Sequence, residues 1–484
     1  MSAPAPGASA APAGASLPPE LREALERLNR QEAELKALRQ EMAAERAARA
    51  EKDAADAAER QKLRAALDAQ EKKSAERATG LLAGVAAVRS ARLQLTLSGF
   101  VQADYSLRQS SEDQVDPATR EPLNEDRFGI RRARLTVGAD YGIVGGNVTI
   151  DGNTLRGTAI RVLGAEATLR WPAPKAGAPP GTPPLIAATF GSFKNPFGYE
   201  VSLQSDTQRL FVERSAVARA LFPGEYDLGF RLQGGWRFLR YAFAIMNGEP
   251  IGERSFPVRD PNKAKDYLGR LGIDTELLPW LRIAAGVSAL RGTGFDRGSP
   301  ATKDTLVWRD LNENGSVDPG EVQVIAGTSA VPASNFSRFG FGGDFQLGIR
   351  VPRLGRLVLY GELAYAANLD RGIQPANPVT AARTLRELGW YLAATQELGR
   401  WAQIGIRYDR YNPDLDANDR QAGVLVPNDA SVSTLSLVGA ARFRDVARFI
   451  VEYDVNRNHL GRDASGRPTN LRDNALTLRA EVVF

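Results

Sequence analysis

The chain has 484 residues, with 62 Lys and Arg against 57 Asp and Glu, one His and no Cys. The lack of Cys excludes disulfides and thiolate metal sites, and a single histidine excludes a zinc site built from paired histidines. No run approaches 18 apolar residues, which excludes a membrane-spanning helix, whereas a membrane barrel strand requires only about ten alternating residues.

The amino-terminal segment has a composition of its own. Residues 1–19 are almost entirely Ala, Pro, Gly and Ser, which predicts a flexible tether. They contain no charged segment followed by an apolar core. Either the chain is not exported by the general route or, as we infer, a native signal peptide has been removed.

Residues 20–80 are rich in Glu, Lys, Arg, Ala and Leu. Leu21, Leu28, Leu35 and Met42 recur every seven residues, which predicts a coiled-coil helix, periplasmic if the barrel predicted below is correct. The alternative is a single solvated helix held by charge pairs four residues apart. The balanced charge of this segment argues against a nucleic-acid role, and residues 81–93 follow as a linker.

From residue 94 the apolar period changes from helical to two. Long alternating segments, with Ala, Gly and Val on the apolar face and aromatics towards the ends, are typical of membrane barrel strands. A soluble sandwich also alternates, but its strands are usually shorter. The segment 94–484 therefore predicts an all-β transmembrane barrel of sixteen antiparallel strands, at residues 94–106, 127–139, 145–152, 158–171, 185–193, 226–235, 238–247, 265–275, 280–291, 336–349, 355–367, 386–397, 401–411, 432–443, 446–457 and 474–484.

The connections between these segments mostly alternate between long and short. Long outer loops and short periplasmic turns are the outer-membrane barrel pattern, with both termini in the periplasm. The last segment ends in Phe484, and a strand ending in an aromatic resembles the assembly signal of outer-membrane barrels. We therefore expect outer-membrane lipid and the barrel-assembly machinery as partners.

Five short motifs carry a family resemblance. They are FGIRRARL at 128–135, GSFKNPFG at 191–198, FVERS at 211–215, DLG at 227–229 and MNG at 246–248. In this order they resemble motifs of the phosphate-selective porins O and P, over roughly residues 95–484. The resemblance implies a trimeric outer-membrane channel of sixteen strands with an anion preference. A coiled coil before the barrel also resembles a variant of that family.

The alternation of residues predicts which basic side chains line the pore. With Ala133, Leu135 and Val137 facing lipid, the neighbouring arginines face the lumen and Arg131 lies near an interface. The same test, together with a connection at 194–225 expected to fold inward, gives a pore-lining, anion-contacting set: Arg132, Arg134, Lys194, Arg209, Arg214, Arg219, Arg231, Arg270, Arg282 and Arg407. Arginine and lysine in a narrow pore raise the local anion concentration.

The alternative role for these basic residues is structural. Luminal arginines can pair with luminal carboxylates and brace the wall, for which the alternation offers Asp151, Glu166, Asp344, Glu362, Asp409, Glu452 and Glu481. Lysine is scarce in the barrel region, and the charge balance there is nearly even. The sequence therefore favours a general anion preference over true phosphate selectivity.

One long connection contains a calcium-loop motif. The segment 310–321 matches D-x-[DN]-x-[DN]-G-x5-E, with Gly315 at the sharp turn. The expected ligands are Asp310, Asn312, Asn314, Ser316 through its carbonyl, Asp318 and Glu321. Two Asn in place of Asp lower the ligand charge, so the motif predicts a weak Ca²⁺ site, and the alternative is a solvated acidic turn.

Three function classes follow from the sequence. The first is a porin for passive diffusion of small hydrophilic solutes, which needs no cofactor for transport. The second is a tether in which the helix links the barrel to peptidoglycan or another envelope component. The third, a hydrolase, is disfavoured because His459 has no evident nucleophile partner, so we expect no enzymatic activity.

Overall fold

The computed structural model describes most of the predicted barrel. The described residues are 36, 85–89 (backbone only), 93–109, 126–154, 159–172, 182–251, 260–421, 424–444, 446–459, 461–462 and 467–484. The chain divides into two units, residues 1–77 and 78–484. In the first unit only Lys36 is described, and it is helical. The predicted tether 1–19 and the rest of the predicted coiled coil 20–80 lie outside the described residues.

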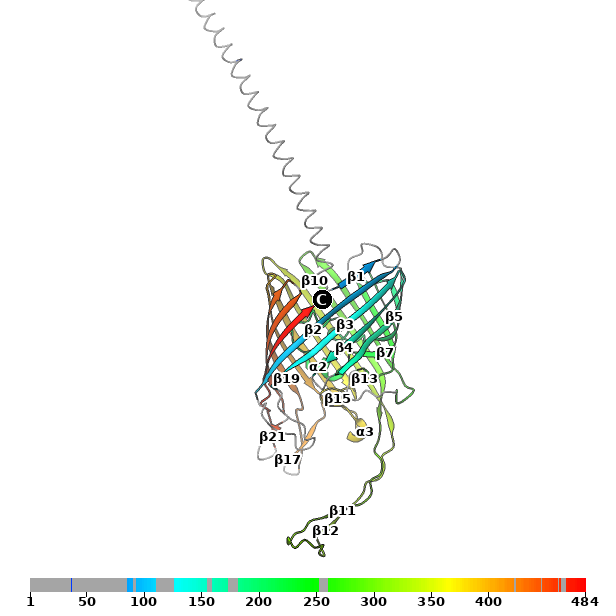
Figure 1. Cartoon of the computed structure of the whole chain (residues 1–484), viewed down its shortest axis with the longest axis vertical. Coiled ribbons are helices and arrows are strands. Elements are labelled where there is room, and N and C mark those ends of the chain that lie inside the picture. Colours follow the sequence, from blue (N-terminus) through cyan, green and yellow to red (C-terminus); the bar gives the residue numbers. More distant parts are fainter. Residues whose placement is uncertain are drawn as a thin grey trace, which may run out of the picture. The chain divides into compact units, whose positions relative to one another are not determined.

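Sixteen of the described strands form one closed antiparallel sheet, as the alternation predicts. They are β2 (Gln94–Arg108), β3 (Arg127–Tyr141), β4 (Val144–Asn153), β5 (Ala159–Trp171), β6 (Ile186–Lys194), β7 (Tyr226–Trp236), β8 (Leu239–Met246), β9 (Asp266–Leu278), β10 (Leu281–Asp296), β13 (Ser334–Val351), β14 (Gly355–Ala367), β15 (Arg386–Leu398), β16 (Ala402–Asn412), β19 (Val432–Phe443), β20 (Ala447–Arg457) and β23 (Ala475–Val483). Each strand pairs with its predecessor, and β23 pairs with β2, which closes the barrel (Figure 1).

The barrel wall is apolar outside and charged inside. On β16, for example, Ile404, Ile406 and Tyr408 are exposed while Arg407 and Asp409 between them are buried. A soluble protein buries its apolar residues, so this reversed pattern requires an apolar surrounding and a polar interior. Among the described residues, no helix is long and apolar enough to cross a membrane.

The two ends of the barrel differ in their connections. Short turns join β3 to β4, β7 to β8 and β15 to β16, and Phe484 lies at this end. Long connections emerge at the other end, where Figure 1 places a protruding hairpin of β11 (Thr305–Trp308) and β12 (Val322–Ile325). The predicted alternation of long and short connections is therefore confirmed.

Several smaller elements were not predicted. The segment taken as a linker, 81–93, contains β1 (Val85–Arg89), which pairs with β2 next to the end of β23. Two further hairpins lie in long connections, and two short helices are described. These elements are β17 (Asn418–Gln421), β18 (Val424–Pro427), β21 (Gly461–Arg462), β22 (Pro468–Thr469), α2 (Ala216–Leu221) and α3 (Pro378–Ala381).

Candidate functional site

The connection between β6 and β7, residues 195–225, folds into the barrel and is called the inward loop below. Its apolar side chains, including Phe197, Phe211 and Leu221, are buried in one cluster with Tyr360 and Tyr391 of the wall. Helix α2 within the loop packs against β15, β16 and β19. The predicted inward fold is therefore present, and it rests on apolar packing against one side of the wall.

Wall side chains also hold the backbone of the inward loop. Glu362 accepts hydrogen bonds from the N–H groups of Tyr199 and Glu200 at 3.1 and 3.3 Å. Glu452 accepts the N–H of Val212 at 2.8 Å. Because buried N–H groups that lack a partner are costly, these two carboxylates fix the loop at two points.

Asp206 of the inward loop lies among four guanidinium groups, and we call these five residues the Asp206 cluster. Arg209 donates to Asp206 at 2.9 Å, and Arg134 also donates to it. Nitrogen atoms of Arg132 and Arg214 lie 3.7 Å from the same carboxylate. Burial alone would raise the pKa of Asp206, but the surrounding guanidinium groups hold that pKa well below its usual range.

A second carboxylate of the loop, Glu213, binds Arg131 and Arg132. Burial would raise the pKa of Glu213, and these two cations instead hold it well below its usual range. The prediction that Arg131 lies near a membrane interface is wrong. The register of β2 and β3 shifts by one residue beside Arg131, and this irregularity turns its side chain towards the loop.

At the short-turn end, the lumen widens into a cavity of about 1280 Å³, called the vestibule below. The inward loop contributes Tyr199, Gln204 and Thr207 to its lining. Eight basic residues line the vestibule, namely Lys194, Arg231, Arg240, Arg270, Arg282, Arg356, Arg442 and Arg448. Three acidic residues line it, namely Asp274, Glu397 and Glu481. The described lining therefore carries an excess of positive charge.

Most of these cations are also paired. Arg270 binds Asp344 at 2.6 Å, Arg231 lies 3.2 Å from Glu166, and Lys194 lies 3.4 Å from Glu225. These three carboxylates are not part of the vestibule lining. The ion pairs expected if the arginines brace the barrel wall are thus present. The basic members of these pairs nevertheless face the cavity.

The predicted pore-lining set therefore separates into groups. Arg132, Arg134, Arg209 and Arg214 belong to the Asp206 cluster, and Lys194, Arg231, Arg270 and Arg282 line the vestibule. Arg407 donates to the Glu213 carbonyl oxygen at 2.8 Å and lies 3.3 Å from Asp409, so it braces the inward loop. Arg219 is exposed on the last turn of α2 and belongs to neither group.

Two groups of residues at this site were not predicted from the sequence: two acidic residues of the inward loop and four arginines of the vestibule. The sequence did not place Asp206 and Glu213 beside β3, because only the folded loop brings them there. The missed vestibule arginines are Arg240, Arg356, Arg442 and Arg448. Arg448 precedes the lipid-facing Phe449, so the alternation that selected Arg407 could have found it.

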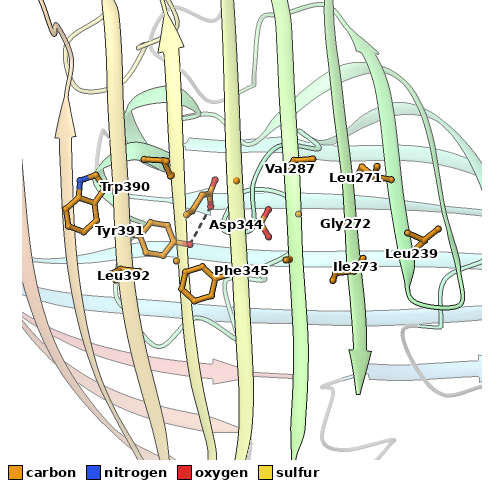
Figure 2. Close-up of a pocket in the computed structure, with 16 residues that line it drawn as sticks. Leu239, Leu271, Gly272, Ile273, Val287, Asp344, Phe345, Trp390, Tyr391 and Leu392 are labelled. Atoms are coloured by element: carbon orange, nitrogen blue, oxygen red, sulfur yellow. Dashed lines mark hydrogen bonds between the residues drawn. The ribbon is translucent and has the colours of Figure 1, made fainter. Parts of the chain in front are cut away.

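A second cavity, of about 640 Å³, lies on the outer face of the wall (Figure 2). Its walls include the exposed side chains of Leu271, Val287, Leu363 and Leu392. Trp390 and Phe345, labelled in Figure 2, also belong to its lining, together with the glycines at positions 343 and 361. This apolar groove is separate from the charged interior.

The calcium-loop motif lies between β11 and β12. The Nδ2 atoms of Asn312 and Asn314 each donate to the same Asp318 oxygen at 2.7 Å. Asp310 accepts the N–H groups of Asn314 and Gly315, the latter in the left-handed region at φ 74°. Ser316 donates its N–H to Asn314 at 2.7 Å. The oxygens of four expected ligands, Asp310, Asn312, Asn314 and Asp318, thus line one turn.

Glu321 closes the same turn, where its carboxylate accepts the N–H groups of Leu311 and Asp318. Within the described part of the chain, no group of three or more His, Cys, Asp or Glu side chains could hold a metal ion. Any cation site in this turn therefore needs the amide oxygens of the two asparagines, which accept the N–H groups of Asn314 and Ser316.

Phe484, the predicted assembly signal, ends the seam between β23 and β2. Its N–H donates to the Gly99 carbonyl at 2.9 Å, and its carbonyl accepts the Gly99 N–H at 2.7 Å. The Phe484 ring covers Gly99 so closely that a Cβ there would lie 2.6 Å from a ring atom. Glycine at position 99 therefore makes room for the terminal ring.

Comparisons of the sequence with protein-family profiles and with curated proteins found no match. Several solved structures have a similar trace. They include OmpT of Vibrio cholerae in a trimer form (10% identity, TM-score 0.47, 81% of this chain and 100% of that chain). They also include the outer membrane channel DcaP of Acinetobacter baumannii (11%, 0.48, 82% and 99%) and an anion-selective porin from Comamonas acidovorans (9%, 0.46, 81% and 100%). These similarities are too distant to indicate a function.

Proposed function

We propose that the protein is a bacterial outer-membrane porin through which small hydrophilic solutes diffuse passively, with a preference for anions. The observation that carries this proposal is the reversed wall, apolar outside and charged inside, around a vestibule lined by eight basic and three acidic residues. A barrel with such a wall is stable in a lipid bilayer and encloses water.

The charge arrangement favours anions in general. Guanidinium groups facing a confined aqueous cavity raise the local anion concentration, because low-dielectric walls focus their field. Many of these guanidinium groups form ion pairs with carboxylates, as Arg282 does with Asp274 at 2.7 Å. These ion pairs weaken the positive electrostatic field in the cavity, so we propose a moderate preference for anions without selectivity for phosphate.

Ion permeability of a double variant in planar bilayers tests whether the basic residues of the vestibule produce the preference for anions. Arg240→Gln and Arg356→Gln together remove two positive charges from the lining and should lower the anion-to-cation permeability ratio. The matched control is Arg291→Gln, because Arg291 is exposed on β10 and does not line the vestibule. An equal change in the control and the double variant would contradict the assignment.

We further propose a homotrimer embedded in outer-membrane lipid and inserted by the barrel-assembly machinery with Phe484 as its signal. Cross-linking in native membranes tests the trimer, which a monomer-only pattern would contradict.

The tether function of residues 20–80 also stays a prediction. Retention of the full chain, but not of a chain lacking residues 1–80, on isolated peptidoglycan would support it.

We also propose that the turn 310–321 binds Ca²⁺ weakly. The support is the twelve-position motif, whose Asp310 and Glu321 carboxylates lie in the same turn and accept backbone N–H groups of that turn. Binding there would rigidify the hairpin of β11 and β12, and it would add no step to solute passage.

A further inference from the structure

The Asp206 cluster has the composition of an anion-binding site. Four guanidinium groups converge on one carboxylate, a number that a structural ion pair does not need. Arg132, Arg134 and Arg214 each have a second carboxylate, in Glu213, Asp151 and Glu225. Arg209 has no second carboxylate among the described ion pairs, so Asp206 is the one anion that all four share.

The cluster is buried and incompletely paired. The side chains of Arg209 and Asp206 are 0% and 2% exposed. The Nη1 atom of Arg209 and the Nη2 atom of Arg214 are buried without a hydrogen-bond partner. Burying a donor without an acceptor costs free energy. An oxyanion with more oxygens than one carboxylate could accept hydrogen bonds from both nitrogens.

The cluster lies directly behind the vestibule. Gln204, Thr207 and Gln208 line that cavity, and Asp206 lies between them in the chain. Lys194 also lines the vestibule and donates to the Gln204 carbonyl at 3.2 Å. None of the five residues of the cluster is itself part of the vestibule lining.

We propose that Asp206 is a tethered anion that occupies an oxyanion site in the inward loop and thereby keeps permeating oxyanions from binding there. This inference rests on the proposed function, because it takes the solute to be an anion. Asp206 then determines specificity: with its carboxylate in place, multivalent oxyanions pass the arginines without being held. Without the carboxylate, the same arginines form a vacant site for inorganic phosphate or sulfate.

The test is the full-length variant Asp206→Ala with inorganic phosphate as the probe. Phosphate should raise the thermal unfolding temperature of this variant in detergent at matched ionic strength, and leave the parent protein unchanged. In bilayers, phosphate should reduce the chloride current of the variant at a concentration at least tenfold lower than in the parent. The matched control is Asp151→Ala, which removes a carboxylate bound to Arg134 but outside the shared position.

Each result decides the proposal. A folded Asp206→Ala barrel that responds to phosphate like the parent or like Asp151→Ala would overturn it. If Asp206→Ala does not refold in chloride, phosphate should restore refolding, and refolding that fails with phosphate as well would overturn the proposal. The thermal readout needs no current, so a parent channel without anion preference would contradict the proposed function while leaving the binding result readable.

Discussion

Arg479 on β23, the last strand of the barrel, donates two hydrogen bonds to Asp104 on β2, each at 2.7 Å, across 375 positions of sequence. The third nitrogen of the same guanidinium donates to the Val212 carbonyl of the inward loop at 2.8 Å. One buried side chain thus joins the seam of the barrel to the loop inside it. This geometry uses the fork of an arginine, which a lysine does not supply.

Removing the carboxylate at this seam should destabilise the barrel strongly. Asp104→Asn keeps the size of the side chain but leaves the buried Arg479 without its counter-charge, a change that typically costs roughly 3–5 kcal/mol. Asp274→Asn is the control, since its partner Arg282 is half exposed and such pairs contribute about 0–1 kcal/mol. Urea unfolding of the refolded proteins measures both, and equal losses would contradict a special role for the seam pair.

The sixteen barrel strands could be predicted from the sequence because alternation is a local property of each strand. Ala133 and Leu135 identify the lipid face of β3, and the lumen-facing positions of Arg132 and Arg134 follow from the alternation. The pairing of Asp206 with Arg134 could not be predicted, because it depends on how a loop of about thirty residues folds back across the lumen. The position of Arg131 was missed for a smaller reason, a one-residue shift in register that alternation does not reveal.

The ion pairs of Asp206 and Glu213 that hold the inward loop should persist over a wide pH range. The pKa values of Asp206 and Glu213 are depressed, so their stabilising charge is fully present above the ordinary values of 3.8 and 4.5 and is lost only as the pH falls further. Protonation of these two carboxylates should therefore not open the loop between pH 7 and about pH 5. A loss of protease resistance within that interval that Glu213→Gln abolishes would contradict this.

Trp390 can report on whether the outer groove faces lipid. Trp390 lines an apolar groove on the wall, whereas Trp308 lies in the protruding hairpin (Figures 1 and 2). In proteins that retain a single tryptophan, lipids with brominated acyl chains should quench the fluorescence of Trp390 strongly and that of Trp308 weakly. Equal quenching of the two would contradict the assignment of the outer face to the membrane.

Calcium should protect the connection that contains β11 and β12. If the turn 310–321 binds Ca²⁺, cleavage of this connection by an added protease should slow by severalfold in millimolar Ca²⁺ relative to chelator. Asp310→Ala should abolish the difference. The same cleavage rate with Ca²⁺ and with chelator in the parent protein would leave the turn as a solvated loop.

If the charged interior is a water-filled path that favours anions, the reversal potential of the purified full-length protein in a planar bilayer under a tenfold KCl gradient will show it. We expect discrete channels with a reversal potential of the sign given by chloride permeation, and a smaller magnitude than for ideal selectivity because many vestibule cations are paired. A silent bilayer, or a reversal potential that favours potassium, would contradict this expectation.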